Sequence, residues 1–389
     1  MMPLEDIRIL DLSRLAPGPF CSMLLADLGA DVLLIEPPPD SRAGQGPGIG
    51  LGAAAYNALG RNKRSIVLNL RDDSARQVFY KLAESADVVL EGFRPGVVQR
   101  LGVDYDTLRE RNTRLVYCSL SGYGQTGPYA GLVGHDINYI SIGGALGLIG
   151  WPDQPPAIPL NVIADFAAGG LHAAFAILAA LHARDRTGRG QFVDIAMSDG
   201  VLYLLAQVIG GYFSSGRVPG AGTTILNGGA AFYNVYQCRD GGWISVGSLE
   251  PHFWANPCRV MEREDFIPHQ HDITKRDEML AHFRERFRSK TRDEWFEILK
   301  TTDICAAPVY ALDEALADPH NQARGMVVEV EHPEVGTVRQ VGIAAKFSET
   351  PGAVRSLAPA PGQHTGEVLA ALGYDADAIR ALRDQGAVV

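Results

Sequence analysis

The amino-acid sequence predicts an α/β fold, with a Rossmann-like doubly wound large domain and a smaller α+β domain. Short apolar strands alternate with helix patterns through the first third of the 389 residues, which is typical of βαβ units around a parallel sheet. After about residue 214 the chain becomes rich in Gly, Ser and Thr, and a β-hairpin pattern follows. We assign residues 1–198 to the large domain, 199–226 to a linker, 227–326 to the small domain and 327–389 to a C-terminal segment.

The elements of the large domain follow in order. The first unit has a strand at 7–12, a helix at 20–28 that Gly29 closes, and a strand at 31–36. The second unit has a strand at 65–70, a helix at 74–85 with Ser74 as its N-cap, and a strand at 87–91. A further strand is predicted at 115–120, and helices are predicted at 165–183 and from about 197 to 209.

The small domain starts with a hairpin and continues with helices. Strands at 232–238 and 243–246 flank Arg239-Asp-Gly-Gly242, a sequence that favours a tight turn. Helices are predicted at 251–263, 276–287 and 292–300, the last with Thr291 as its cap. Beyond Val327 we expect short strands and then two helices, at 365–372 and 376–385.

Composition narrows the function. The net charge of −10 argues against non-specific nucleic-acid binding and against a polybasic membrane surface. The five cysteines are scattered, and the N-terminus has no secretory pattern, so we expect reduced thiols and a cytoplasmic protein. The apolar run at 166–183 reaches membrane-spanning length, but it is rich in Ala and Gly and includes His172, so we predict a core helix and no membrane partner.

Several common motifs are absent from the sequence. The loop after the first strand carries one glycine, which does not match the G-x-G-x-x-G spacing of a nicotinamide dinucleotide site. His269 and His271 have no third ligand at a useful spacing, so no metal site is predicted. No Walker loop and no Gly-x-Ser-x-Gly elbow occurs.

Basic residues follow two neighbouring predicted strands. Arg71 closes one strand, and Phe93, Arg94 and Arg100 follow the next. Ligands of open α/β sheets bind outside the carboxyl ends of the strands. These residues are therefore candidates for phosphate contacts and for stacking on a base, although each arginine alone also fits a solvated surface position. As a set they predict a ligand that contains a nucleotide.

Three residues are candidates for proton transfer, and each has a structural alternative. Asp165 begins a predicted helix, where an N-cap carboxylate is favoured and held anionic by the helix dipole. His135 lies in a loop, where histidine also serves as an ordinary polar residue. Glu250 precedes a helix of the small domain and fits a helix N-terminus as well.

The chain resembles the family III CoA-transferases and, within that group, the α-methylacyl-CoA racemases. The likeness spans essentially the whole chain. It rests on segments 28–32 (LGADV), 61–65 (RNKRS), 92–96 (GFRPG), 119–127 (SLSGYGQTG), 134–139 (GHDINY), 164–170 (ADFAAGG), 186–191 (RTGRGQ), 227–233 (NGGAAFY) and 247–251 (GSLEP). The Ala-Asp segment is shared by the whole group, whereas GHDINY and the later Glu-Pro are more characteristic of the racemases.

The resemblance implies roles for individual residues. His135 and Asp165 would form the catalytic pair, and Glu250 would support His135. The residues implied in coenzyme A binding are Leu68, Leu70, Arg71, Gly92, Phe93, Arg94, Arg100, Gly134, Asp136, Ile137, Asn138 and Tyr139. The resemblance also implies an interlocked homodimer, in which the chain's end returns to the large domain and the active site combines two subunits.

Two activities within this resemblance are open. In a racemase, His135 and Asp165 would move the α-proton of a 2-methyl-branched acyl-CoA, with no cofactor beyond the coenzyme A of the substrate. In a CoA-transferase, Asp165 would be a nucleophile. A silent acyl-CoA binding protein is a third reading, from another functional class. The nature of the acyl chain is not indicated.

Two positions depart from the family pattern. Pro37 stands where relatives have an arginine that contacts a phosphate of coenzyme A. This contact is missing here unless Arg42 supplies it. Ala231 stands where a proline is usual. Neither position touches the expected acid/base pair, but the first is expected to alter coenzyme A recognition.

Overall fold

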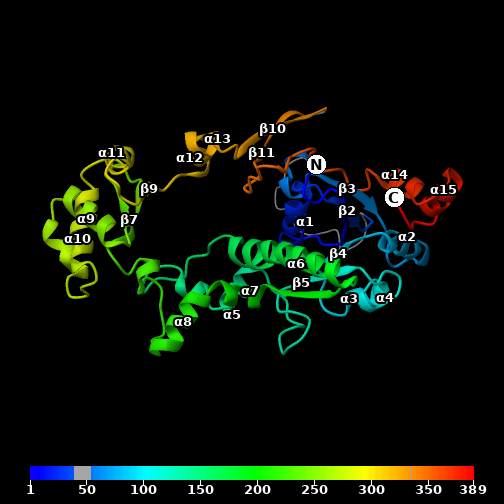
Figure 1. The fold of residues 1–389 in the computed structure, drawn as a ribbon, viewed down its shortest axis with the longest axis horizontal. Helices are drawn as coiled ribbons and strands as arrows, with labels where there is room; N and C mark the ends of the chain where they lie inside the picture. The colour runs from blue at the N-terminus through cyan, green and yellow to red at the C-terminus, as the bar shows by residue number, and fades with distance from the viewer. Residues whose placement is uncertain (39–53, 334) are drawn as a thin grey trace. The chain divides into compact units, whose positions relative to one another are not determined.

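The computed structural model describes residues 1–38, 54–333 and 335–389. Contacts divide the chain into two compact units (Figure 1). The first unit comprises Met1–Gly143, Leu160–Leu204 and Pro319–Val389, and the second comprises Gly144–Pro159 and Leu205–Asp318. Each unit is therefore built from separated stretches of the chain.

A six-stranded parallel sheet forms the centre of the first unit. Its strands are β1 (Arg8–Asp11), β2 (Asp31–Glu36), β3 (Lys63–Val67), β4 (Val88–Glu91), β5 (Val116–Ser121) and β6 (Phe192–Ala196). They lie in the order β3-β2-β1-β4-β5-β6, which confirms the doubly wound prediction. The chain reverses its direction of travel between β1 and β4, and ligands of such sheets bind at this switch point. The sequence analysis missed β6.

Helices cover the sheet, and buried side chains hold them there. The larger helices are α1 (Pro17–Asp27), α2 (Asp73–Glu84) and α6 (His172–Thr187), and the shorter ones are α3 (Val97–Leu101), α4 (Tyr105–Arg109), α5 (Asp136–Ile142) and α7 (Met197–Leu204). Val78 and Phe79 of α2 are fully buried against strand residues such as Ile66 and Val89. The N-cap of α2 is Asp72 rather than the predicted Ser74, because Asp72 Oδ1 accepts from the backbone N–H groups of Ser74 and Ala75.

The second unit contains an antiparallel sheet packed with helices. The sheet consists of β7 (Tyr233–Gln237), β8 (Trp243–Gly247) and β9 (Ala306–Pro308), which confirms the predicted hairpin. The helices are α8 (Ala206–Ser215), α9 (Pro251–Val260), α10 (Arg276–Phe287), α11 (Arg292–Leu299) and α12 (Leu312–Ala317). Trp254, Phe283 and Trp295 form the centre of its core. Helix α8 lies inside the stretch read as a linker.

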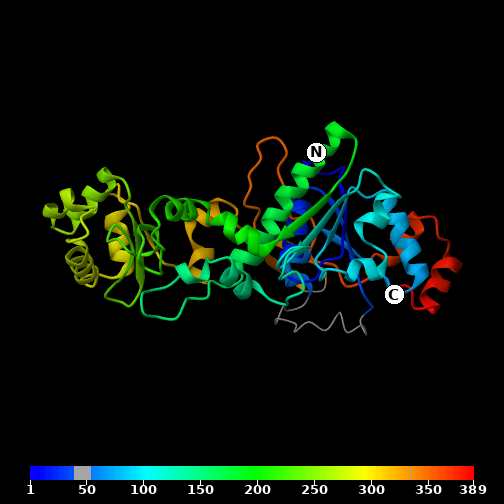
Figure 2. The same cartoon turned by 90° about the horizontal axis from the view of Figure 1, so that it is seen from below.

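The last part of the chain returns to the first unit. It comprises α13 (Pro319–Ala323), the strand pair β10 (Val327–His332) and β11 (Gly336–Val341), and the helices α14 (Thr365–Ala371) and α15 (Ala376–Asp384). The helices α14 and α15 lie beside α2 in Figure 1 and Figure 2. Short 3₁₀ turns occur at Ala54–Tyr56, Ala58–Gly60, Leu146–Leu148, Ile225–Asn227 and Glu264–His269.

Buried polar residues fasten this returning segment. Arg61 pairs with Asp27 at 2.6 Å, and both side chains are buried. The Asn62 side chain donates to Ala353 O and accepts from the backbone N–H of Arg355. Further along, Val388 forms an antiparallel bridge with Leu68, so the end of the described chain lies directly against the residues that follow β3.

Candidate active site

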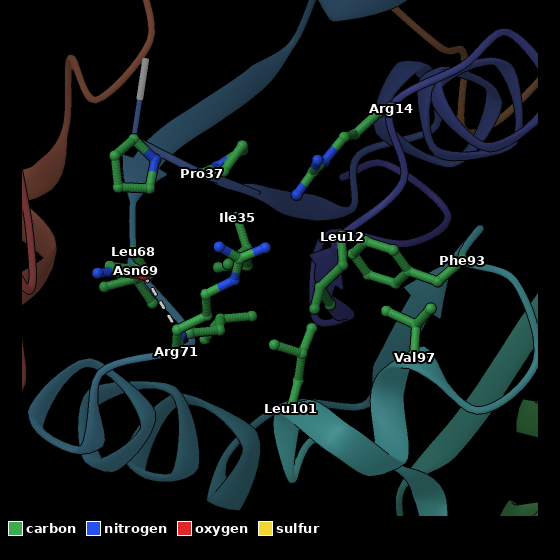
Figure 3. Close-up of a pocket in the computed structure, with 12 residues that line it drawn as sticks. Leu12, Arg14, Ile35, Pro37, Leu68, Asn69, Arg71, Phe93, Val97 and Leu101 are labelled. Atoms are coloured by element: carbon green, nitrogen blue, oxygen red, sulfur yellow. Dashed lines mark hydrogen bonds between the residues drawn. The ribbon is translucent and has the colours of Figure 1, made fainter. Parts of the chain in front are cut away.

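A pocket opens at the carboxyl ends of β1 to β4, around the switch point of the sheet. Its volume is about 240 Å³. The residues that line it are Leu12, Arg14, Ile35, Pro37, Pro38, Leu68, Asn69, Leu70, Arg71, Phe93, Val97 and Leu101 (Figure 3). Of the expected coenzyme A contacts, the structure therefore brings Leu68, Leu70, Arg71 and Phe93 together here. Apolar walls with a few cations suit the base and phosphates of a nucleotide.

Arg14 is a charged pocket residue that the sequence analysis missed. Arg14 and Arg71 both point toward the middle of the pocket (Figure 3). The Arg14 guanidinium carbon lies 5.3 Å from the centre of the Phe93 ring, and burial lowers the Arg14 pKa against the opposing charge of Glu36. The available signal was its place in the loop after β1, the same strand-end rule that selected Arg71. Pro37 lines this pocket too, whereas Arg42 lies outside the described residues.

Asp136, which follows His135 in the chain, links this segment to the one that carries Asp165. His135 precedes α5 and is exposed, and Asp136 is its first residue and is 4% exposed. Asp136 Oδ2 accepts from the backbone N–H of Ala164 at 2.7 Å and from that of Asp165 at 2.8 Å. Asp136 thus ties the start of α5, which His135 precedes, to the backbone that carries Asp165.

The segment around Asp165 differs from the predicted helix start. Asp165 lies inside a π-helical stretch, Val162–Leu171, that continues into α6, and Asn161 precedes it. Asp165 is therefore not the helix cap. Asn161 Nδ2 instead donates to Asp165 Oδ2 at 3.1 Å. π-Helical turns are rare and occur often at functional sites.

The surroundings of Asp165 favour its protonated form. Burial raises the pKa of the Asp165 carboxyl, and the negative charge of Asp136 adds to this effect. The hydrogen bond from Asn161 and the charge of His135 act in the opposite direction on the same pKa. A carboxyl whose pKa is raised toward neutrality is suited to give and take protons.

Tyr139 shapes the loop that carries His135. Its hydroxyl donates to Gly134 O at 2.5 Å, and its ring packs edge-on against Tyr123 with centroids 5.1 Å apart. A Cβ on Gly134 would lie 2.8 Å from the Tyr139 ring, so this position requires glycine. The charges of Asp165 and Arg94 both act on the Tyr139 pKa, which burial raises to about 12.

The other predicted site residues occupy varied positions. Asn138 Oδ1 accepts from the backbone N–H of His135 at 3.1 Å, and Ile137 is 37% exposed. Gly92 follows β4 beside Ser13. Arg100 is exposed on α3 and does not line the pocket. Glu250 is exposed and precedes α9 in the second unit.

The described residues contain no group of three or more His, Cys, Asp or Glu side chains arranged to hold a metal ion. His269 Nδ1 lies 3.2 Å from Asp272 Oδ2, an exposed local contact. The continuous helix Val162–Thr187 is long and apolar enough to span a membrane by length and composition alone, and 39% of its most apolar window is buried. Its exposed side chains include Leu171 and Phe175.

Known proteins are similar to this chain in sequence and in fold. The model of CoA-transferase family III matches residues 4–365. The chain is 37% identical over 381 residues to alpha-methylacyl-CoA racemase of Homo sapiens, covering 97% of this chain and 95% of the relative. It is 30% identical over 396 residues to succinyl-CoA:glutarate CoA-transferase of Homo sapiens, covering 99% and 90%. A CAIB/BAIF family protein from Brucella suis has a similar structure, with a TM-score of 0.80, 30% identity and coverage of 95% and 99%.

The fold is a doubly wound α/β sheet with an arginine-bearing pocket at its switch point. The chain belongs to CoA-transferase family III. It is an enzyme of the superfamily that contains both the CoA-transferases and the α-methylacyl-CoA racemases, and the resemblance seen in the sequence is confirmed.

Proposed function

We propose that this protein is a racemase that inverts the C2 stereocentre of 2-methyl-branched acyl-CoA thioesters. The observation that carries the proposal is the pair of hydrogen bonds by which Asp136, the neighbour of His135 in the chain, holds the backbone at Ala164 and Asp165. The 37% identity to a human alpha-methylacyl-CoA racemase supports it. The pocket between Arg14 and Arg71 would take the nucleotide end of the substrate.

The reaction is a 1,1-proton transfer. One member of the His135–Asp165 pair removes the proton from C2, and the electron pair of the C–H bond moves into an enolate at the thioester oxygen. The other member donates a proton to the opposite face of C2, so the configuration inverts. General acid–base help contributes about 100- to 10,000-fold per positioned group. This chemistry requires no cofactor beyond the coenzyme A of the substrate, and we propose that the enzyme works in the cytoplasm.

The enolate oxygen also requires hydrogen-bond donors. Backbone N–H groups near the start of the Asp165 helix are natural candidates for these donors. Asp136 engages the N–H groups of Ala164 and Asp165. The donors to the enolate must therefore be other groups, and these two amides serve to hold the helix.

Proton NMR of a 2-methylacyl-CoA in deuterated water tests the proposal. A racemase exchanges the α-proton, so the methyl doublet collapses to a singlet. His135→Ala is expected to slow this exchange at least 100-fold. Undiminished exchange of both epimers by the variant would contradict the assignment of His135. Binding of the ligand with neither exchange nor acyl transfer would instead indicate a silent binding protein.

A second activity has specific support, because transferases are also among the relatives. In that reaction Asp165 attacks the thioester carbonyl, forms a mixed anhydride and expels the coenzyme A thiolate. The thiolate then attacks the Asp165 carbonyl of the anhydride, which releases the acyl group as a carboxylate and leaves an aspartyl thioester. Hydroxylamine added with acyl-CoA would convert Asp165 to a hydroxamate that mass spectrometry detects. We favour racemisation because the transferase reaction has no role for His135.

We also propose that the enzyme is a homodimer and that Glu250 of the partner subunit completes each site. Large apolar side chains are exposed on consecutive helices, among them Leu171, Phe175 and Tyr203, and a second subunit would cover them. Mixing H135A with E250A tests this arrangement. Random reassortment gives half heterodimers, each with one intact site of two, so we expect about a quarter of wild-type activity. Recovery of no activity would contradict sharing of the site.

A further inference from the structure

Glu91, the last residue of β4, is buried and accepts hydrogen bonds on both carboxylate oxygens. Glu91 is 1% exposed. Oε2 accepts from the backbone N–H of Phe93 at 2.7 Å, and Oε1 accepts from the Ser119 hydroxyl on β5. Glu91 therefore holds the start of the loop at 92–96, which places Phe93 in the nucleotide pocket.

The hydrogen bonds continue from Ser119 to a second loop. Gln125 Nε2 donates to Ser119 Oγ at 2.8 Å. Gln125 belongs to the loop at 121–127, in which Tyr123 packs against Tyr139. One chain of hydrogen bonds thus joins the loop of the nucleotide pocket to the loop that packs on the His135 helix.

We propose that Glu91 is a positioning residue for acyl-CoA, and that its carboxylate form fixes the loops at 92–96 and 121–127 together. The inference rests on the coenzyme A ligand of the proposed function. Glu91 does not line the nucleotide pocket but a separate cavity of about 370 Å³, so it acts through Phe93. An ionised carboxylate accepts on both oxygens, whereas protonation turns one oxygen into a donor. Protonation therefore reverses the hydrogen bond between Glu91 and Ser119, and it removes the negative charge that strengthens the hydrogen bond from the Phe93 N–H.

The charge state of Glu91 changes near neutral pH. Burial raises the Glu91 pKa to about 7, against the hydrogen bonds from Ser119 and Phe93, which lower it. Asp194 on β6 raises it slightly further. Because the ionised fraction grows as the pH passes 7, coenzyme A binding is expected to tighten between pH 6 and pH 8.

Other titratable groups also lie around Glu91. Burial raises the pKa of Asp194, which accepts from the backbone N–H of Gln125 at 3.0 Å. Burial raises the pKa values of Tyr117 and Cys118 on β5 well above this range, so both stay neutral. Asp104 lines the same cavity and accepts from the backbone N–H of Thr107, as the cap of α4. Replacing Glu91 is expected to remove the part of the pH dependence of coenzyme A binding that comes from Glu91.

Calorimetric titration of free coenzyme A into wild type and Glu91→Gln between pH 6 and pH 8 tests the inference. A buried hydrogen bond to a charged group is worth about tenfold in affinity. With a Glu91 pKa of about 7, E91Q should bind about ninefold more weakly than wild type at pH 8 and about twofold more weakly at pH 6. The phosphates of the ligand titrate equally in both proteins, so the ratio of the two Kd values isolates Glu91.

Two further variants sharpen the test. Asp106→Asn removes an exposed carboxylate on the same cavity and is expected to leave the pH profile of Kd unchanged. Ser119→Ala removes a hydrogen bond that lowers the Glu91 pKa, so the midpoint of the profile should move to higher pH.

Each outcome is decisive. A Kd ratio that stays constant with pH, or an unmoved midpoint in S119A, would overturn the positioning role while leaving the proposed function intact. Failure of the wild type to bind coenzyme A at any pH would overturn the proposed function and the inference with it. If E91Q does not fold, the wild-type and S119A profiles decide the question, since both contain Glu91.

Discussion

Replacing Asp136 tests whether this residue holds the Asp165 helix in place. In Asp136→Ala, the backbone N–H groups of Ala164 and Asp165 lose a shared acceptor at a position that is 4% exposed. A buried donor left unsatisfied costs about 1–3 kcal/mol. With two such donors, D136A is expected to lose about 2–6 kcal/mol of unfolding free energy.

Asp136→Asn separates the acceptor from its charge. The amide oxygen still accepts hydrogen bonds, so the expected loss falls to about 1–2 kcal/mol. The negative charge of Asp136 raises the pKa of Asp165. D136N should therefore lower the Asp165 pKa, and the part of the pH–rate profile that depends on Asp165 should move to lower pH.

The choice of assay follows from the positions of the tryptophans. All four tryptophans of the sequence lie in the second unit, so intrinsic fluorescence does not follow the unit that contains Asp136. Urea unfolding by far-ultraviolet circular dichroism, with hydrogen exchange of peptides from Val162–Leu171, is suitable instead. Asp185→Asn, at a carboxylate that is 67% exposed, is the matched control and should change stability by less than about 0.5 kcal/mol. Equal unfolding midpoints and equal exchange in D136A and D185N would refute the reasoning.

Three further predictions concern the pocket, the acid/base pair and the returning segment. Arg14→Ala should weaken coenzyme A binding about tenfold in calorimetry, and Pro37→Arg in the same chain should restore part of it; no change in either variant would contradict a phosphate role. Asn161→Ala removes a hydrogen bond that lowers the Asp165 pKa, so the Asp165 limb of the pH–rate profile should shift to higher pH, and a shift to lower pH would contradict the cause. Arg61→Ala leaves the buried Asp27 carboxylate without its cation, with the Asn62 amide still donating to it. The variant should lose about 3 kcal/mol of unfolding free energy in urea titration, and a loss below about 1 kcal/mol would contradict the prediction.

Much of the fold could be predicted from the sequence because its strands are short apolar runs between clear turn signals. The strand β2 and the helix α10 have the predicted bounds. The strand β6 was missed because its sequence, Phe-Val-Asp-Ile-Ala, mixes exposed and buried positions, and only the last two are buried. The predicted helix ended near residue 209, inside α8 (Ala206–Ser215), because Gly210, Gly211 and two serines, which are poor helix formers, follow in the second half of α8.

The candidate site could be predicted only where it depends on position along a strand. The strand-end rule placed Arg71 and Phe93 in the pocket correctly. It could not identify the role of Asp136, which depends on a contact with backbone atoms of a distant helix. It also could not identify the π-helical turns around Asp165, because an apolar run has the same composition in either kind of helix. The predicted domain bounds and site roles stay predictions.

The pairing of Val388 with Leu68 has a consequence for biosynthesis. The ribosome releases the strands around the pocket early, but Val388, which bridges to Leu68, is made much later. At about 5–20 residues per second, this delay is on the order of 15–60 s. Throughout that time the nascent large unit exposes apolar surface that α14 and α15 later cover. Messages that end early would therefore yield a chain with its pocket residues present but unsupported, which is a substrate for chaperones and proteases.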